Sequence, residues 1–307
     1  MTTEITCRAC GSTHTTLRGR KPGWTSSREY SFHDCTDCGL LFVEPFAGFD
    51  IYNDAYYRGE GPDPFVDYES EYRDWRRTDR GLEFDDFARI ASAHFSACPS
   101  LSVPASPVAW LDFGCGAGGF LKYLRERRSF HGRSLHLTGH DVGSYAELLA
   151  RDDGFRILNL DALAREPDAS YDVISMIEVI EHLPAPSEQL ALVARLLKPG
   201  GLLLLTTGNL DCPVARRRGI YYGYCAPEIH VSLFSPRSLA HLYRRHGLAP
   251  RAVRFRGAVT YKVVKTLRHR PALRGLARAA LVLPPVRRLV DWLYGVSAMP
   301  CAVKPAS

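Results

Sequence analysis

A run of glycines follows directly on an apolar segment that carries one acidic residue near its end. The segment reads Trp110-Leu111-Asp112-Phe113-Gly114-Cys115-Gly116-Ala117-Gly118-Gly119-Phe120. This pattern predicts a buried strand, a tight turn and the start of a helix, and such a turn lets backbone amides approach a nucleotide-like ligand closely. The glycine spacing also fits a dinucleotide-binding turn. The Asp112 carboxylate, however, suits a ligand amine and would repel a pyrophosphate.

Two further short segments end on acidic residues. Residues 134–139 precede His140-Asp141, and residues 155–160 precede Asp161-Ala162. An acidic side chain at a second strand end suits a ribose diol, and Asp161 is placed to meet an adenine amino group. The chain continues with Tyr171-Asp172-Val173-Ile174, Glu178-Val179-Ile180-Glu181-His182-Leu183 and, after an expected helix, Leu196-Leu197-Lys198-Pro199-Gly200-Gly201.

Four elements follow one another in the chain: the Asp-x-Gly-x-Gly turn, an acidic strand end, the Tyr-Asp-Val-Ile…Glu-His-Leu segment and the Leu-Leu-Lys-Pro-Gly-Gly segment. In this order they resemble the class I S-adenosylmethionine-dependent methyltransferases, specifically the small-molecule branch that includes the ubiquinone-type O-methyltransferases. The resemblance covers about residues 106–250. It implies an α/β fold with a Rossmann-like seven-stranded sheet and S-adenosylmethionine as the methyl donor. A tight turn without a ligand is the alternative, which the later motifs disfavour. The donor site is expected to contain Asp112, Phe113, Gly114, Gly116, Asp141, Asp161, Ala162 and Glu178.

Four of the nine cysteines form two matching pairs near the N-terminus. They read Cys7-x-x-Cys10-Gly11 and Cys35-x-x-Cys38-Gly39. Two such loops supply a closed tetrahedron of thiolates, which predicts a structural Zn²⁺ site in a segment too short to have much core of its own. A redox pair or a nucleic-acid finger is the competing interpretation. The other cysteines lack paired spacing and are expected to be small buried residues: Cys98, Cys115, Cys212, Cys225 and Cys301.

The segment between the cysteine pairs and the glycine turn is dense in tyrosine and acidic residues. Residues 70–96 predict one helix with Phe84 and Phe87 on its apolar face. In the resembled branch such a segment folds over the methyl donor, where tyrosine rings suit a sulfonium cation, so we expect a helical aromatic lid. The alternative is that the rings only pack the cysteine module on the core. Residues 99–107, rich in Ser and Pro, are the expected linker.

The loop after the Lys-Pro-Gly-Gly segment gathers side chains suited to acceptor chemistry. It carries three arginines, three tyrosines, Glu228 and His230, at a place where open α/β sheets bind substrates. In the resembled family, the pattern His230-x-x-Leu233-Phe234-Ser235 points its histidine into the active site. A base that removes the acceptor's proton favours methyl transfer to oxygen. We expect His230 as that base, Glu228 as an orienting or alternative base, and His182 as a second candidate. The alternatives are that His230 is a loop histidine bonded to local backbone and that His182 caps a helix or orders the donor pocket.

The resemblance also bears on which atom is methylated. In sugar C-methyltransferases with a similar zinc module, the corresponding histidine directly follows a glutamate. Here Ile229 separates Glu228 from His230. This difference argues against the dyad and against carbon methylation.

Residues 260–295 look like an insert before a final strand at 298–304. They hold eight basic residues and one acidic residue, a balance of 8 − 1 = +7 against +6 for the whole chain. Apolar residues recur at helical spacing until Pro284-Pro285 breaks the pattern. Three interpretations stay open: a solvated face beside the acceptor cleft, a phosphate-binding patch for a nucleotide-linked or carrier-bound substrate, and an interfacial membrane helix.

The sequence thus divides into five expected parts. They are a zinc-binding module (1–46), a lid and linker (47–105), a methyltransferase core (106–258), a basic helical insert (259–295) and a final strand with its tail (296–307). The chain has no run of about 18 apolar residues and no basic start followed by an apolar stretch, so we expect a cytoplasmic protein with at most peripheral membrane contact.

We expect a small-molecule methyltransferase that acts on a hydroxyl, less readily a carbon, of a sugar or secondary-metabolite intermediate, which can be phosphate-bearing or carrier-linked. The alternative is an RNA methyltransferase whose zinc module and basic insert contact phosphates. Nucleic acid is disfavoured because the basic residues lack an aromatic stacking array. A binding protein that keeps the donor site without chemistry is a third interpretation.

Overall fold

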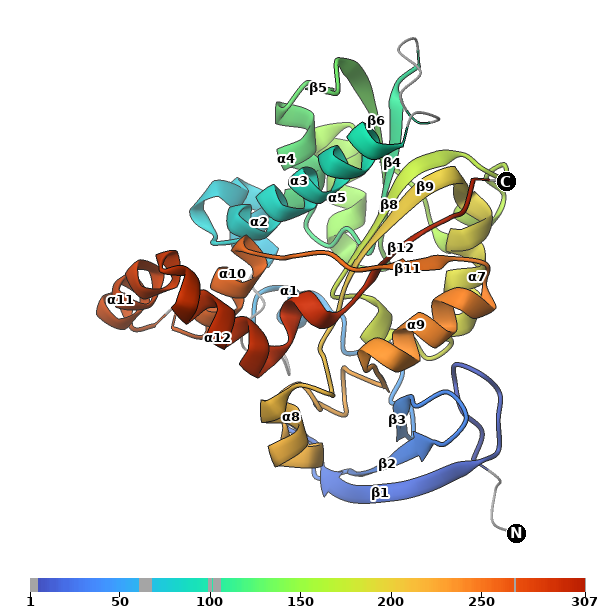
Figure 1. Ribbon diagram of the computed structural model, residues 1–307, viewed down its shortest axis with the longest axis vertical. Helices are drawn as coiled ribbons and strands as arrows, with labels where there is room; N and C mark the ends of the chain where they lie inside the picture. Colours follow the sequence, from blue (N-terminus) through green and yellow to red (C-terminus); the bar gives the residue numbers. More distant parts are fainter. Residues whose placement is uncertain (1–4, 61–67, 99–100, 102–105, 268, 307) are drawn as a thin grey trace.

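From Val108 onward, apolar strands and amphipathic helices alternate and build one twisted sheet with helices on both faces (Figure 1). The computed structural model describes residues 5–60, 68–98, 101, 106–267 and 269–306. The sheet has the order β11-β12-β9-β8-β4-β6-β5, and β7 also pairs with β6. Its strands are β4 (Val108–Phe113), β5 (Ser129–Phe130), β6 (Arg133–His140), β7 (Arg156–Ile157), β8 (Tyr171–Ile177), β9 (Leu197–Thr206), β11 (Ala249–Arg251) and β12 (Cys301–Val303).

This arrangement confirms the expected α/β architecture. Strands β7, β6, β4, β8 and β9 run parallel, while β12 is antiparallel to both β9 and β11. The sheet has eight strands rather than the expected seven, because the two-residue strand β5 folds back on β6 as a hairpin. The strand expected near 252–256 lies at Ala249–Arg251 instead, and the backbone N–H of Phe255 donates to the Ser297 hydroxyl.

Neighbouring residues on each central strand face opposite sides of the sheet, so two apolar cores form. One contains Leu111 and Ile174 with residues of α7 and α9; the other contains Trp110 and Val173 with residues of α3 and α4. The helices that cover the sheet are α3 (Gly81–Ala97), α4 (Gly119–Glu126), α5 (Ser144–Asp153), α6 (Leu160–Ala164), α7 (Pro186–Leu196) and α9 (Pro236–Arg245).

The cysteine-rich N-terminal part forms a second, smaller sheet below the first (Figure 1). Its order is β1-β2-β3-β10, with antiparallel pairing throughout. The bounds are β1 (Thr15–Pro22), β2 (Glu29–Cys35), β3 (Leu41–Glu44) and β10 (Ser232–Leu233). Strand β10 belongs to the segment expected to carry the acceptor chemistry, so the two sheets are joined through that segment.

The aromatic segment is not one helix. It contains α1 (Asp54–Tyr57), α2 (Tyr68–Asp74), the 3₁₀ turn η1 (Trp75–Arg77) and α3. The helix expected over 70–96 breaks because the Asp74 side chain accepts the Arg76 N–H and caps η1, after which Thr78 is extended. The break lets α3 pack on the sheet while α2 turns toward the glycine loop. Most of the linker expected at 99–107 lies outside the described residues.

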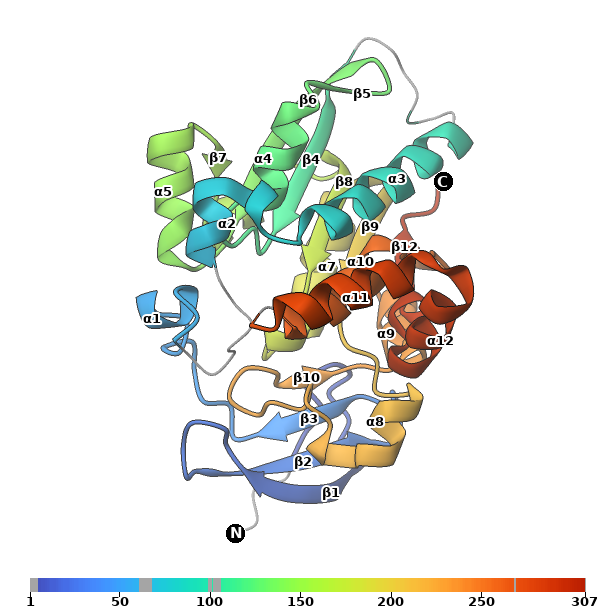
Figure 2. The same ribbon diagram turned by 90° about the vertical axis from the view of Figure 1, so that its left-hand side faces the viewer.

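The basic insert folds into three helices on one side of the molecule (Figure 2). They are α10 (Gly257–Thr266), α11 (Pro271–Val282) and α12 (Pro284–Tyr294), followed by η5 (Val296–Ala298). The break expected at Pro284-Pro285 separates α11 from α12, since proline suits a first helical turn and ends the preceding helix. The remaining elements are η3 (Ile180–His182), α8 (Pro213–Arg218) and η4 (Gly219–Tyr221). Among the described helices, none is both long and apolar enough to cross a membrane.

Candidate active site

The glycine turn after β4 is held in a conformation that larger residues rarely adopt. Gly114, Gly116 and Gly118 have φ angles of +79°, +52° and +73°. The Gly114 N–H donates to the His140 carbonyl over 2.6 Å, which ties the turn to the end of β6. A Cβ atom on Gly116 would lie 2.7 Å from the Tyr68 ring. The first residue of α2 therefore packs directly over the loop that we expect to hold the methyl donor.

Asp141 and Asp112 lie at the ends of the neighbouring strands β6 and β4. The Asp141 carboxylate accepts the backbone N–H groups of Gly116 and Gly143 at 2.7 and 2.8 Å, and the Tyr57 hydroxyl donates to it at 3.3 Å. Asp112 is buried and accepts the Ser175 hydroxyl at 2.6 Å. Burial raises the pKa of Asp112 to about 7. Asp141 thus accepts more hydrogen bonds than Asp112, and one of the donors is a tyrosine of the lid.

The other expected donor residues are spread along the same edge of the sheet. Phe113 is buried against His140, with ring centroids 4.6 Å apart. Asp161 is exposed in the first turn of α6, where the Asn159 side chain accepts the Ala162 N–H over 2.8 Å. Glu178 follows β8 with a φ of +55°. Of the expected donor residues, Glu178 alone lines the large cavity described next.

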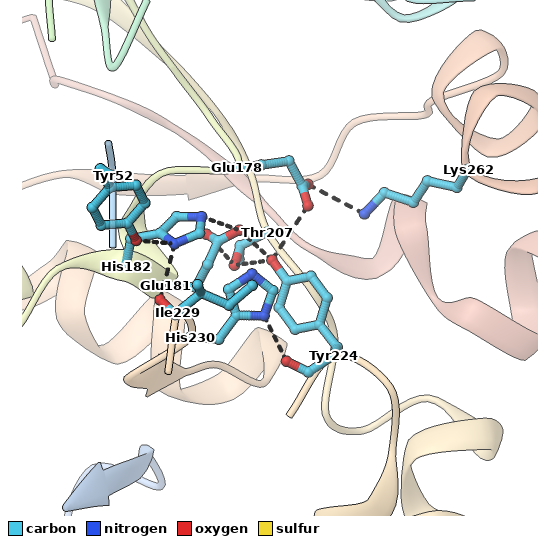
Figure 3. Close-up of polar contacts among 9 residues, drawn as sticks. All are labelled: Tyr52, Glu178, Glu181, His182, Thr207, Tyr224, Ile229, His230 and Lys262. Atoms are coloured by element: carbon cyan, nitrogen blue, oxygen red, sulfur yellow. Dashed lines mark hydrogen bonds and ion pairs between the residues drawn. The ribbon is translucent and has the colours of Figure 1, made fainter. Parts of the chain in front are cut away.

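A cavity of about 650 Å³ lies at the carboxyl ends of β8 and β9, between the lid, α10 and the loop that precedes β10. Three expected site residues line it, namely Glu178, His182 and His230. Figure 3 shows them together with Glu181 and Tyr224 in one polar cluster. This volume suits a small molecule.

Glu178 and Glu181 form a pair of carboxylates whose pKa values are shifted in opposite directions. Glu181 is buried and accepts the Tyr224 hydroxyl and, at 2.8 Å, the Thr207 hydroxyl. Burial and the charge of Glu178 raise the pKa of Glu181 to about 8. Burial also acts to raise the pKa of Glu178, but Lys262, with its Nζ 3.2 Å from Oε1, and Lys265 together outweigh it and lower this pKa to about 2. Near neutral pH, Glu178 carries the charge and Glu181 holds a proton.

The two histidines lie edge to face with ring centroids 4.8 Å apart. Nδ1 of His230 is 2.6 Å from the Tyr224 carbonyl oxygen, which can only accept, so Nδ1 carries the hydrogen and Nε2 carries the lone pair. Burial, followed by the neighbouring His182, lowers the pKa of His230 to about 3. His182 Nδ1 lies 2.9 Å from the Ile229 carbonyl and 2.7 Å from the Tyr52 hydroxyl of the lid. His230 is therefore neutral, with a lone pair on Nε2, and burial makes that nitrogen a weaker base than an exposed imidazole.

Glu228 lies away from this cluster and does not line the cavity. Its carboxylate accepts the backbone N–H groups of Trp24, Thr25 and Ser26 at 2.9, 3.0 and 3.3 Å. Although burial acts to raise the pKa of Glu228, these hydrogen bonds outweigh it and lower that pKa. The geometry places Glu228 as an anchor for the β1–β2 hairpin, whose Trp24 side chain does line the cavity.

The lid contributes charged residues that the sequence analysis did not single out. Arg80 lies in the cavity wall, 3.7 Å from Glu71 and 3.4 Å from Glu83. Neither carboxylate oxygen of the buried Glu83 has a hydrogen-bond partner among the described residues. The sequence shows these residues only as part of a mixed run of charges. The burial of these side chains depends on the break after η1, which the sequence pattern did not predict.

Within the described part of the chain, two groups of side chains could hold a metal ion. The four paired cysteines lie together, with Sγ–Sγ distances of 3.5 Å for Cys7–Cys38 and Cys10–Cys35. A tetrahedral zinc site with Zn–S bonds of about 2.3 Å needs separations of about 3.8 Å, so this thiolate set fits Zn²⁺. In the cavity, Glu181, His182 and His230 each place one donor atom within 4.8 Å of the others. That oxygen and nitrogen set suits a divalent cation.

The five unpaired cysteines lie apart from the cluster of four. Four of them are buried, and Cys98 is partly buried. These positions agree with the expectation that the unpaired cysteines act as small apolar residues.

The strand order, the glycine turn and the acidic strand ends define a class I methyltransferase fold with a site at the carboxyl edge of its sheet. A family model described as a methyltransferase domain matches residues 83–253, which is more than half of the chain. The chain belongs to this methyltransferase family, as the sequence motifs indicated.

The curated relatives include proteins named ubiquinone biosynthesis O-methyltransferase from several bacteria. The one from Marinobacter nauticus is 36% identical over 109 residues, covering 32% of this chain and 43% of the relative. The one from Caulobacter vibrioides is 33% identical over 122 residues, covering 39% and 48%. The chain therefore spans less than half the length of these relatives.

Solved structures with a similar arrangement include the [4+2]-cyclase SpnF, with a TM-score of 0.42 and 19% identity over 72% of this chain and 81% of that one. Another is a putative sarcosine dimethylglycine methyltransferase from Galdieria sulphuraria, with a TM-score of 0.43 and 18% identity over 71% and 86%.

The buried Asp112 carboxyl predicts a pH-dependent stability. Because its folded pKa is raised to about 7, the stability it contributes is present below its ordinary pKa and is lost as pH rises through about 7. Asp112→Asn cannot ionise. We expect its unfolding free energy to rise relative to the native chain between pH 4 and pH 8, by at most about 4 kcal/mol. Urea unfolding across this range measures the difference.

The exposed variant Asp161→Asn is the control for Asp112→Asn. Parallel curves of unfolding free energy against pH for Asp112→Asn and the native chain would contradict the prediction.

The hydrogen bonds to Glu228 predict that this residue stabilises the contact between module and core. Glu228→Gln keeps the size of the side chain but removes the charge that three backbone N–H groups contact. We expect a loss of about 1–3 kcal/mol in unfolding free energy. Glu29→Gln on the same hairpin is the matched control, because that side chain is 69% exposed. Equal losses in both variants would refute the anchoring role.

Proposed function

We propose that this chain transfers a methyl group from S-adenosylmethionine to a hydroxyl of a small molecule bound in the 650 Å³ cavity. The observation that carries this proposal is the neutral His230, a residue of the cavity lining whose Nδ1 is bound to the Tyr224 carbonyl and whose Nε2 carries the lone pair. The names of the curated relatives support transfer to oxygen. Family membership supports the methyl donor.

The donor would lie along the carboxyl edge of the sheet. Asp141 would accept the ribose hydroxyls, and the first turn of α6 with Asp161 and Ala162 would meet the adenine. Glu71 packs over Gly119 and lies 3.7 Å from Arg80, so this part of the lid offers both signs of charge to the zwitterionic amino-acid end. When bound, S-adenosylmethionine supplies an electrophilic methyl group.

The residues of the cavity would handle the acceptor's proton. His230 Nε2 accepts the hydroxyl proton as the new carbon–oxygen bond forms. The resulting imidazolium faces Glu178, whose charge persists because Lys262 holds its pKa low. His182, fixed between the Ile229 carbonyl and Tyr52, keeps the His230 ring in place. Glu228 would act on the site indirectly, by positioning Trp24.

The walls of the cavity favour a ring-shaped, hydroxylated acceptor such as a sugar or a secondary metabolite. Aromatic side chains from the hairpin, the lid, the acceptor loop, α10 and α12 surround it, and polar groups lie between them. Flat rings pack on such walls while hydroxyls reach the polar groups. The aromatic residues in the lining are Trp24, Tyr56, Tyr68, Tyr222, Tyr224, Tyr261 and Tyr294.

We further propose that Cys7, Cys10, Cys35 and Cys38 hold a structural Zn²⁺. Four protein ligands leave no open position for chemistry. The ion would fix the module, whose sheet includes β10 only two residues after His230. Zinc would thereby act on the active site through the backbone of the acceptor loop.

His230→Ala tests the proposed base. We expect methyl incorporation from labelled S-adenosylmethionine into the small-molecule fraction of cell extracts to fall 10²- to 10⁴-fold. Binding of S-adenosylhomocysteine, measured by calorimetry, should stay within about twofold, since His230 lies in the acceptor loop. The control is His241→Ala, an exposed residue of α9. Unchanged turnover in His230→Ala would refute the role of this residue, and label in RNA would favour the alternative acceptor class.

Cys38→Ser tests the zinc site. We expect the native chain to contain one zinc per molecule by metal analysis and the variant to contain much less, with a lower midpoint of thermal unfolding. Cys98→Ser is the matched control, because Cys98 lies outside the cluster. Zinc-free native protein with four freely reactive thiols would refute the site.

A further inference from the structure

The helical hairpin formed by α11 and α12 carries an unusual amount of exposed apolar surface. Thirteen large apolar residues are largely exposed among the described residues, and seven of them lie between 273 and 294. Soluble monomers rarely gather such residues in one patch without a binding role. The seven are Leu273, Leu276, Val282, Leu283, Leu289, Trp292 and Tyr294, with exposures of 43–72%.

The orientation of α11 explains this exposure. Arg274 and Arg278 both pair with Asp79, and Arg274 lies 2.8 Å from that carboxylate. Only Leu281 of this helix is buried. A helix that packs for stability alone would turn its leucines inward, whereas α11 is held by charged residues and presents Leu276 to solvent.

Several arginines on or beside these helices have no ion-pair partner among the described residues, although Arg216 lies 3.7 Å from Asp211. Helix α8 packs against α12 and adds three arginines, 216–218, followed by Tyr221, which is 70% exposed. Figure 2 shows α8, α11 and α12 on the same side of the molecule. The acidic residue of the hairpin, Asp291, is bound to the Ser297 N–H at 2.8 Å. Among the described residues, no ion pair involves Arg217, Arg218, Arg270, Arg287 or Arg288.

We propose that α8, α11 and α12 form a docking surface for an anionic lipid membrane. Leucine and valine side chains would enter the acyl boundary, Trp292 and Tyr221 would lie at headgroup level, and the arginines would contact lipid phosphates. Among the interpretations of the insert, this one uses both its charge and its apolar residues.

The charge of the surface argues against two other occupants. A second copy of the chain would bring arginines to arginines without acidic partners, since symmetric dimers pair the same patch on both subunits. An RNA would use the arginines but would leave the exposed leucines without a role. An anionic bilayer satisfies both kinds of side chain.

Vesicle binding by the full chain tests the proposal. The probes are vesicles of phosphatidylcholine with 30 mol % phosphatidylglycerol and vesicles of phosphatidylcholine alone, assayed by co-sedimentation in 50 mM and 500 mM salt. We expect at least tenfold tighter binding to the anionic vesicles, and weaker binding at the higher salt concentration. We expect Leu276→Ser with Trp292→Ser, and separately Arg287→Gln with Arg288→Gln, each to weaken this binding at least tenfold.

The matched control combines Leu17→Ser with Arg165→Gln, an exposed apolar residue and an exposed arginine outside the surface. It should bind vesicles like the native chain. Unchanged S-adenosylhomocysteine binding and unchanged midpoints of thermal unfolding would show that the variants fold. The vesicle assay itself does not depend on methyl transfer. Three results would overturn the proposal: no binding to anionic vesicles at low salt, equal binding by the hairpin variants, or binding of a second copy or of RNA that the hairpin variants lose while vesicle binding persists.

Discussion

Two carboxylates after β8, the buried Glu181 and the partly buried Glu178, impose the main constraint on this structure. Glu178 and Glu181 are close enough that both cannot ionise at low energetic cost, so the surrounding elements must supply cations and hydrogen-bond donors. Strand β9 is followed by Thr207, the acceptor loop brings Tyr224, and α10 brings Lys262. These elements are distant in the sequence, and the carboxylate pair explains why they meet at one place.

The same constraint accounts for the arrangement of the histidines. Burial and the neighbouring His182 keep His230 neutral, while the Tyr224 carbonyl fixes the hydrogen on its Nδ1. His182 connects the acceptor loop to the lid through Tyr52. The lid thus contacts the sheet at both ends of the site, over the glycine loop through Tyr68 and over the histidines through Tyr52.

The N-terminal module is linked to this site through backbone hydrogen bonds and does not supply a reacting group. Strand β10 completes its sheet, and Glu228 accepts three of its amide groups. Both contacts flank His230 in the sequence. The module therefore restrains the acceptor loop from outside, while Trp24 at its hairpin reaches the cavity wall. A cysteine cluster far from the chemistry can in this way affect the shape of the acceptor site.

The sequence by itself determined the sheet, the glycine turn and the cysteine cluster, because each depends on local patterns: apolar runs, glycines with positive φ and short paired spacings. The partner of Glu228 and the outward face of α11 depended on tertiary structure. In each case a charged or polar side chain chose between solvent and a distant partner. Residue type shows that such a group needs a partner, but only the folded chain shows which one it finds.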